Sequence, residues 1–148
     1  MMTVTALLLL AALAALDGQA RVIDGDTLVV SGQHIRLDGI DAPEIKQVCQ
    51  RGGDWRCGLA ATDAVKAIIG TSEVRCEGST KDRYKRLIAT CWAGSVNLNE
   101  AMVRSGWAVA YRRYSITYVP AEEEAKGEKV GIWSSEFQMP WEWRRGGP

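Results

Sequence analysis

Acidic side chains flank two predicted strands near the start of this chain. The stretch IDGDTLVV, residues 23–30, contains Asp26, and the stretch GIDAPE further on contains Asp41 and Glu44. Arg36 lies between the two clusters. The candidate ligands are all oxygen atoms, and oxygen-rich sites suit Ca²⁺ or Mg²⁺ rather than zinc. The pattern therefore predicts a hard metal ion held close to a phosphate.

Two arginines extend this candidate chemistry. Arg36 is expected on the strand that leads to Asp41, and Arg86 comes from a separate strand. A guanidinium pair beside a metal ion suits a phosphodiester, because negative charge grows on the equatorial oxygens during displacement. Each feature alone has a simpler interpretation, since DGDT is also typical of an Asx-turn and both arginines could be surface strand residues. The combination favours phosphodiester chemistry.

The hydrophobic pattern predicts strands interleaved with three helices. Apolar residues at helical spacing indicate helices over 57–70 and 96–111. The second is capped by Asn97 or Asn99 and has Gly106 near its end. Residues 120–133 have the Glu/Lys pairs of a solvent-facing helix that ends near Gly131. Strands are expected near 22–23, 28–30, 35–40, 72–78 and 86–94, with a turn at 31–33. These elements indicate an α+β fold, a small oligonucleotide-binding barrel with helices packed outside it.

Length and charge indicate one globular domain without a strongly basic surface. The chain has 148 residues, and its 18 basic residues balance 18 acidic ones, so the formal net charge is zero. A chain of this length can bury an ordinary hydrophobic core. Zero net charge argues mildly against a protein that holds DNA by bulk electrostatics. It does not argue against an enzyme that binds one phosphate locally.

The first twenty residues have the character of an export signal. The apolar run ALLLLAALAAL is too short to span a bilayer, and the small residues Gly18 and Ala20 resemble a signal-peptidase site before Arg21. A buried N-terminal helix is the alternative, since no Lys or Arg precedes Arg21. We predict a signal peptide over 1–20 and one domain over 21–148. The processed protein is then periplasmic or secreted, without stable membrane association.

Four cysteines agree with export. An even cysteine count in an exported chain indicates disulfides, and three pairings are possible. We prefer Cys49 with Cys57 and Cys76 with Cys91, the nearest neighbours in the expected fold. Zinc binding is the alternative, but no CxxC spacing occurs and His34 is the only histidine.

Several ordered blocks of the sequence resemble the staphylococcal nuclease (thermonuclease) family. The blocks are VIDGDTLVVSGQHIRLDGIDAPE, DRYKRLIATCWA, LNEAMVRSGWAVAY and GIW, and the similarity extends from about Arg21 to Trp143. The two cysteine pairs and the ending FQMPWEWRR resemble the exported bacterial branch. The resemblance implies a five-stranded oligonucleotide-binding barrel with three helices. It also implies a monomeric, Ca²⁺-dependent phosphodiesterase that cuts DNA and RNA and leaves 3′-phosphates.

The resemblance implies a role for individual residues. Asp26 and Asp41 match the metal-binding aspartates, and Ala42 takes the place of a threonine that lends its backbone carbonyl to the metal. Glu44 matches the glutamate thought to activate or orient the attacking water. The phosphate-clamping arginines are matched by Arg36 and Arg86, and the substrate-binding set is Arg83, Tyr84 and Tyr111.

Two departures from the family pattern bear on function. Lys85 stands where the family usually has glycine, so the backbone conformation that leads to Arg86 is expected to differ from that of the family. The near-zero charge predicts weaker and more salt-sensitive substrate binding. Some members of the superfamily have lost catalytic residues and act as binding modules for nucleic acid or protein. Because the acidic and arginine set is complete here, we expect an enzyme.

Overall fold

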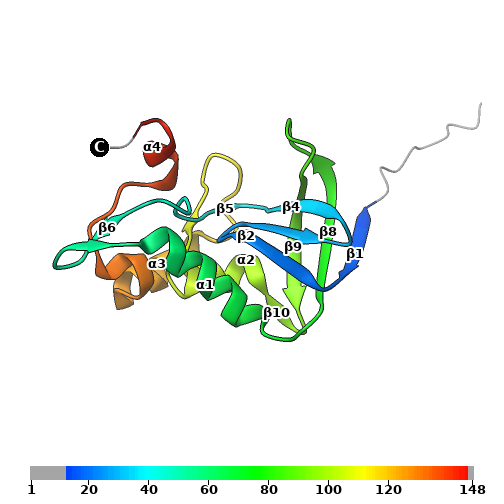
Figure 1. The fold of residues 1–148 in the computed structure, drawn as a ribbon, viewed down its shortest axis with the longest axis horizontal. Coiled ribbons are helices and arrows are strands. Elements are labelled where there is room, and N and C mark those ends of the chain that lie inside the picture. The colour runs from blue at the N-terminus through cyan, green and yellow to red at the C-terminus, as the bar shows by residue number, and fades with distance from the viewer. Residues whose placement is uncertain (1–12, 147–148) are drawn as a thin grey trace, which may run out of the picture.

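A curled sheet with helices packed against it forms the centre of the protein (Figure 1). The computed structural model describes residues 13–146. The strands of the main sheet follow the order β1-β8-β9-β4-β3-β2, and β10 also pairs with β9. These strands are β1 (Ala14–Gly18), β2 (Ala20–Asp24), β3 (Thr27–Val30), β4 (Gln33–Leu37), β8 (Val74–Lys81), β9 (Leu87–Ala93) and β10 (Val96–Asn97).

The expected oligonucleotide-binding fold is confirmed. The five strands expected from the sequence correspond to β2, β3, β4, β8 and β9, so β1 and the two-residue β10 are additions. Two small ladders lie outside the main sheet. They pair β5 (Ile40–Asp41) with β11 (Val109–Ala110), and β6 (Cys49–Gln50) with β7 (Asp54–Trp55).

Alternation along β4 and β9 separates a core face from a functional face. Ile35 and Leu37 are fully buried, whereas Arg36 between them is only partly buried and faces away from that core. The parallel pairing of β4 with β9 sets Arg36 beside Ile88 in register. Because side chains alternate in a strand, Arg36 and Ile88 lie on the face opposite the apolar core.

A two-residue turn connects β3 to β4. Ser31 and Gly32 both have positive φ, at 49° and 75°, and Val30 pairs with Gln33 across the turn. Turns with two positive φ angles match the right-handed twist of the flanking strands. The turn expected at 31–33 is therefore confirmed, and it fixes the register that brings Arg36 opposite Thr27.

The first helix agrees with the sequence, and the second is shorter than expected. α1 (Cys57–Ile69) ends at Gly70, and α2 (Leu98–Arg104) begins after Asn97, whose side chain accepts a hydrogen bond from the Glu100 backbone N–H at 3.0 Å. The sequence placed Gly106 near the end of this helix, and the helix does stop just before it, so the last residues of the stretch 96–111 are not helical. Gly106 has a φ of 81°, so the helix ends there and residues 109–110 form β11 instead.

The C-terminal region contains the third expected helix, which is shorter than the predicted 120–133, and further short elements. α3 (Val119–Glu128) ends where Lys129 adopts the left-handed conformation, and a 3₁₀ turn follows at Gly131–Ser134. The short α4 (Pro140–Arg144) was not expected. Figure 1 shows α4 above the sheet, on the same side as the loop that follows β11.

Both preferred cysteine pairings are confirmed. Cys49–Cys57 joins β6 to the first residue of α1, and Cys76–Cys91 joins positions that are in register on β8 and β9. The first disulfide belongs to a second apolar cluster, separate from the main core. That cluster includes Val109 and Ile132, and aromatic side chains from the C-terminal region pack against it.

None of the helices within residues 13–146 is long and apolar enough to cross a membrane. Residues 1–12 of the predicted export signal lie outside the described residues. The rest of that segment is part of the sheet, because β1 pairs with β8 over five positions from Ala14 to Gly18. Leu16 packs against the main core, and the Ser31 hydroxyl donates to the Asp17 carbonyl at 2.7 Å. Cleavage before Arg21 remains a prediction.

This pairing gives the N-terminal boundary a measurable consequence. A chain that starts at Arg21 should be less stable than one that starts at Leu13, because it loses the β1 ladder and the contact of Leu16 with the core. We expect a loss on the order of 1–3 kcal/mol from those hydrogen bonds and that apolar burial. Urea unfolding of the two chains is the measurement. Equal midpoints and slopes would show that β1 contributes nothing to stability.

Candidate active site

The turn between β2 and β3 presents Asp26 to the interior of the protein. Gly25 is required there, because a Cβ at this position would lie 2.7 Å from the Ala42 side chain. This close approach lets the Ala42 backbone N–H donate to Asp26 Oδ2 at 2.8 Å. Asp26 is buried, and its Oδ1 accepts a hydrogen bond from the Thr27 hydroxyl at 3.1 Å. The carboxylate is therefore held in one orientation.

Arg36 joins Asp26 to Asp41. Its Nη2 lies 3.4 Å from Asp26 Oδ2 and 3.4 Å from Asp41 Oδ1. Its Nη1 donates to the backbone carbonyls of Leu37 and Ile40, at 2.9 and 3.0 Å. The guanidinium is thus fixed at the end of β4, and the two aspartates predicted to bind metal lie on either side of it.

Glu44 lies in the loop after β5, on a turn stabilised by Gln47. The Glu44 backbone N–H donates to Gln47 Oε1 at 3.1 Å, and the Gln47 N–H donates to the Glu44 carbonyl at 2.7 Å. The start of α1 packs directly on this turn, because a Cβ on Gly58 would overlap the Glu44 carbonyl oxygen. The side chain of Glu44 is about one-third exposed, at 34%.

Asp24 is a site residue that the sequence analysis did not single out. One of its carboxylate oxygens accepts a hydrogen bond from the Asp26 backbone N–H at 3.1 Å. Burial, reinforced by the charge of Asp26, raises the pKa of Asp24 to about 7. Its sequence signal was present, since the same IDGDT stretch contains both aspartates.

The pKa values of the two buried carboxylates, Asp41 and Asp26, shift in opposite directions. Burial and the neighbouring Asp26 raise the pKa of Asp41 to about 6, although Arg144 and Arg36 oppose the shift. For Asp26, burial also disfavours the charged form, but Arg36 and the hydrogen bonds from its neighbours hold its pKa below the usual value. A divalent cation would favour the ionised form of each carboxylate, so its binding should release protons near neutral pH.

Arg86 belongs to the turn between β8 and β9. Its Nε donates to Asp82 Oδ2 at 2.7 Å, and its backbone N–H donates to Asp82 Oδ1 at 3.0 Å. Lys85 has a φ of 64°, the left-handed conformation in which glycine is favoured. The departure from the family's usual glycine therefore leaves the turn intact, with a lysine in a strained conformation. The pKa of Asp82 is below its usual value, because Arg86 outweighs the effect of burial.

The parallel pairing of β4 with β9 relates the position of Arg36 to that of Arg86. Arg36 pairs with Ile88 between β4 and β9, and Arg86 lies two residues before Ile88. Residues two apart in a strand share a face. Arg86 itself lies in the turn, one residue before β9, so the predicted pair of arginines comes from β4 and from the turn that leads into its neighbour β9, with the acidic residues near the end of β4.

The predicted substrate-binding residues lie in two places. Arg83 and Tyr84 are in the β8–β9 turn, where Arg83 Nη2 donates to the Tyr84 hydroxyl at 2.7 Å and Tyr84 is 63% exposed. Tyr111 instead follows β11, where its ring stacks on Tyr114 with centroids 4.8 Å apart. Trp141 of α4 contacts the same Tyr111 ring, with centroids 5.2 Å apart.

Arg144 is the second site residue that the sequence analysis missed. Its Nη1 and Nη2 donate to the two oxygens of Asp41, each at 2.9 Å. Its Nη1 also donates to Glu44 Oε1 at 2.7 Å. No local signal marks this residue, because it lies 103 positions from Asp41 in the chain.

The donor set fits a hard cation, although the carboxylates are not gathered around a central point. Among residues 13–146, no group of three or more His, Cys, Asp or Glu side chains is placed to hold a metal ion. Asp26 and Asp41 provide carboxylate oxygens next to the Ala42 backbone, which is the oxygen chemistry that Ca²⁺ accepts together with water. Arg144 holds Asp41 and Glu44 in this arrangement.

The fold and the site define an oligonucleotide-binding barrel that carries an acidic, arginine-rich centre on one face. A family model described as "Staphylococcal nuclease homologue" matches residues 34–135. The chain belongs to the staphylococcal nuclease family. The resemblance in the sequence blocks is thereby confirmed.

The chain is similar to several curated relatives. It is 40% identical to "Succinoglycan biosynthesis protein ExoI" of Rhizobium meliloti (strain 1021), with 80% of this chain and 65% of that protein covered. It is 36% identical to an "Uncharacterized endonuclease" of Escherichia coli O157:H7, with 84% and 81% covered. It is 34% identical to "Thermonuclease" of Staphylococcus hyicus, with 78% and 73% covered. Nuclease names therefore recur among its relatives, beside a name from succinoglycan biosynthesis.

Proposed function

We propose that this protein is a Ca²⁺-dependent phosphodiesterase that hydrolyses DNA, RNA or both and leaves 3′-phosphates. The observation that carries the proposal is the buried contact of Arg36 with both Asp26 and Asp41, at 3.4 Å each. This contact sets a guanidinium suited to phosphate beside the two proposed metal ligands. Family membership and the nuclease names of relatives support the same reaction.

Each residue has a defined part in this reaction. Asp26, Asp41 and the Ala42 carbonyl would hold the ion, which when bound supplies a Lewis acid for a phosphate oxygen. Glu44 takes a proton from the attacking water, or orients that water, as a general base. The water oxygen bonds to phosphorus as the bond to the 5′-oxygen breaks, and the departing 5′-oxygen takes a proton from solvent to become a hydroxyl. Arg36 and Arg86 stabilise the negative charge on the phosphate oxygens.

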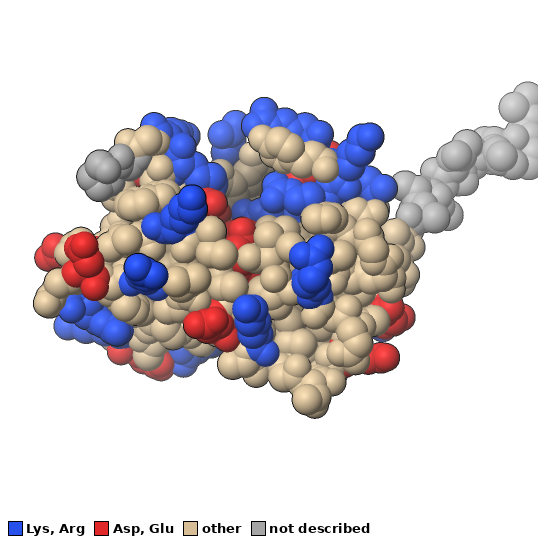
Figure 2. All heavy atoms as spheres, viewed as in Figure 1, with Lys and Arg blue, Asp and Glu red and all other residues tan. Residues whose placement is uncertain are grey.

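The surface around the site is suited to a nucleic acid. Figure 2 shows Lys and Arg side chains gathered along the upper edge, over α4 and the β8–β9 turn, with acidic atoms between them. Exposed aromatic rings stand near both places. Tyr84 is on the turn, and Tyr114 is in the loop after β11, stacked on Tyr111, whose ring contacts Trp141 of α4. Bases stack on such rings without sequence preference, and nearby cations bind the backbone. We therefore propose single-stranded nucleic acid as the preferred form of substrate.

The remaining expectations belong to the same proposal. A monomer is sufficient, because the proposed catalytic groups come from one chain. Export to the periplasm or the medium is supported by the two disulfides. A catalytically inactive binding module is the alternative function, and the complete set of carboxylates and arginines favours the enzyme.

Digestion of nucleic acids with and without calcium tests the proposal. We expect the purified protein to degrade single-stranded DNA in Ca²⁺, to lose this activity in a chelator and to leave fragments with 3′-phosphates. The products can be identified by whether a 3′-phosphatase is needed before polymerase extension. Full activity in the chelator would contradict the metal role. Binding without cleavage under every condition would favour the inactive module.

A further inference from the structure

Arg144 donates three hydrogen bonds to two residues of the proposed active site. Asp41 is completely buried, and both of its oxygens accept from Arg144 at 2.9 Å. A third bond, at 2.7 Å, goes to Glu44. One guanidinium therefore donates hydrogen bonds to a proposed metal ligand, Asp41, and to the proposed general base, Glu44, at the same time. Such two-pronged, charge-assisted bonds are the strong class of protein hydrogen bonds.

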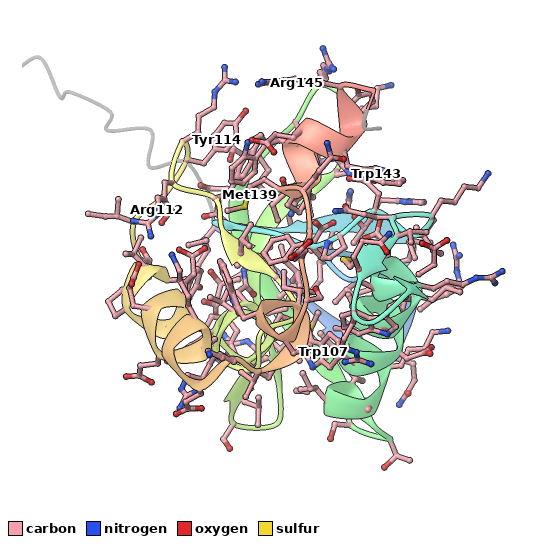
Figure 3. All side chains as sticks on the ribbon, turned by 90° about the vertical axis from the view of Figure 1, so that its left-hand side faces the viewer. Trp107, Arg112, Tyr114, Met139, Trp143 and Arg145 are labelled. Carbon is pink, nitrogen blue, oxygen red and sulfur yellow. A yellow bond between two sulfur atoms is a disulfide. The ribbon has the colours of Figure 1, made fainter. Side chains whose placement is uncertain are left out.

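The C-terminal segment is anchored so that this contact is built into the fold. The Gln47 side chain donates to the Gln138 carbonyl at 2.8 Å, and it is the same Gln47 that supports the Glu44 turn. Pro140 at the start of α4 is buried, and Trp141 packs on Tyr111. Figure 3 shows the helix standing over the sheet, with Arg145 at its outer end. Several independent contacts of the C-terminal segment therefore hold Arg144 at the site.

A metal ion at Asp41 would compete with Arg144. The guanidinium occupies one lone pair on each Asp41 oxygen, and Arg36 approaches Oδ1 as well, so little of the carboxylate is left for a cation. Two positive charges on one buried carboxylate also repel each other strongly where the dielectric constant is low. The side chain of Arg144 is 37% exposed, so solvent is directly available when it leaves.

We propose that Arg144 is a resident cation of the metal-free protein, which competes with the divalent ion for Asp41 and Glu44 and leaves them when the ion binds. This inference rests on the proposed function, because it assumes that the acidic site takes a divalent cation. It also couples metal binding to catalysis. Arg144 also holds Glu44 Oε1, so when the ion displaces it, both oxygens of the proposed base become open to water.

Calcium titration of three proteins tests the competition. The proteins are the wild type, Arg144→Gln and Arg145→Gln, and the measurement is isothermal calorimetry after chelator treatment. The Arg145 variant is the matched control, because it removes the same charge from the adjacent residue without touching Asp41. If Arg144 is bound to Asp41 in about nine molecules out of ten, its removal should tighten calcium binding about tenfold. The control should change affinity by less than about twofold.

Thermal unfolding of the same proteins gives a second readout that does not depend on activity. Without metal, Arg144→Gln should unfold at a lower temperature than Arg145→Gln, because buried Asp41 loses its main partner. With saturating calcium the two variants should become similar, since the ion replaces the missing cation. A gap of the same size in calcium would mean that Arg144 stays on Asp41, which contradicts the proposal.

The outcomes separate this inference from the proposed function. Calcium binding by the wild type with equal or weaker affinity in Arg144→Gln would overturn the competition and leave the nuclease proposal standing. Weaker binding in particular would make Arg144 a positioning residue for the ligands. If none of the three proteins binds calcium, both proposals are wrong.

Discussion

Replacing Glu44 by glutamine should lower the rate of DNA cleavage by roughly 10²-fold or more, as the loss of a general base does. Raising the calcium concentration should not restore the rate, because the amide cannot take a proton from water. Calcium binding should be weakened little, since the proposed ion is held by Asp26, Asp41 and the Ala42 carbonyl. The fold should survive, because the Glu44 side chain is partly exposed and the Gln47 bonds that hold its turn are to the backbone.

Asp26→Asn provides the contrasting variant. Its side chain keeps the shape that accepts the Ala42 N–H, but it loses a full negative charge next to the proposed ion. A hard cation binds less tightly when its first shell loses that charge. We expect a higher calcium requirement and partial recovery of activity as calcium rises, which is the opposite of the behaviour of Glu44→Gln.

Activity on single-stranded DNA against calcium concentration distinguishes the two roles, with calorimetry for the metal itself. The assigned roles are wrong if calcium rescues Glu44→Gln and does not rescue Asp26→Asn. If neither change affects cleavage, the nuclease proposal itself fails.

The parts of the site that the sequence predicted are those defined by local chemistry. IDGDT and GIDAPE place acidic residues at the ends of strands, and strand ends are determined by short-range turn and alternation signals. The structure brings Asp26, Arg36 and Asp41 together as those signals suggested. Asn97 was one of two predicted caps, and its side chain does cap α2. Asn99 instead bridges the Cys91 N–H and the Ala89 carbonyl in the core.

The parts that the sequence did not predict depend on contacts between distant segments. Gly106 was predicted near the end of the second helix, but not its tight crossing with another segment, where an added side chain would overlap the Val130 carbonyl. Arg144 was unforeseen for the same reason, since its partners lie about a hundred positions earlier in the chain. Local propensity carries no information about either contact.

Replacing Arg86 by lysine should reduce turnover by about 10²-fold to 10³-fold, the cost of losing one preorganised donor in a transition state. In the structure the Arg86 Nε is held by Asp82 at 2.7 Å, and its Nη groups have no hydrogen-bond partner among residues 13–146. This leaves them available to two oxygens of one phosphate. A lysine ammonium keeps the charge, but it cannot hold Asp82 and two phosphate oxygens in the same plane.

The stability of the Arg86→Lys protein should change little, because this ion pair is partly solvent-exposed and such pairs contribute about 0–1 kcal/mol. Arg75→Lys is the matched control, since Arg75 is an exposed residue of β8 paired with Glu77. The measurement is kcat on single-stranded DNA at saturating calcium, with circular dichroism to confirm the fold. A role based on charge alone predicts near-full activity for Arg86→Lys, and that result would show that a bidentate phosphate contact is the wrong picture.

Arg36→Lys should lose activity as well, but it should also lose stability, because the Arg36 Nη1 donates to two backbone carbonyls and its Nη2 contacts two buried aspartates. The cleaner evidence for phosphate clamping therefore comes from Arg86, where catalytic loss and structural loss separate.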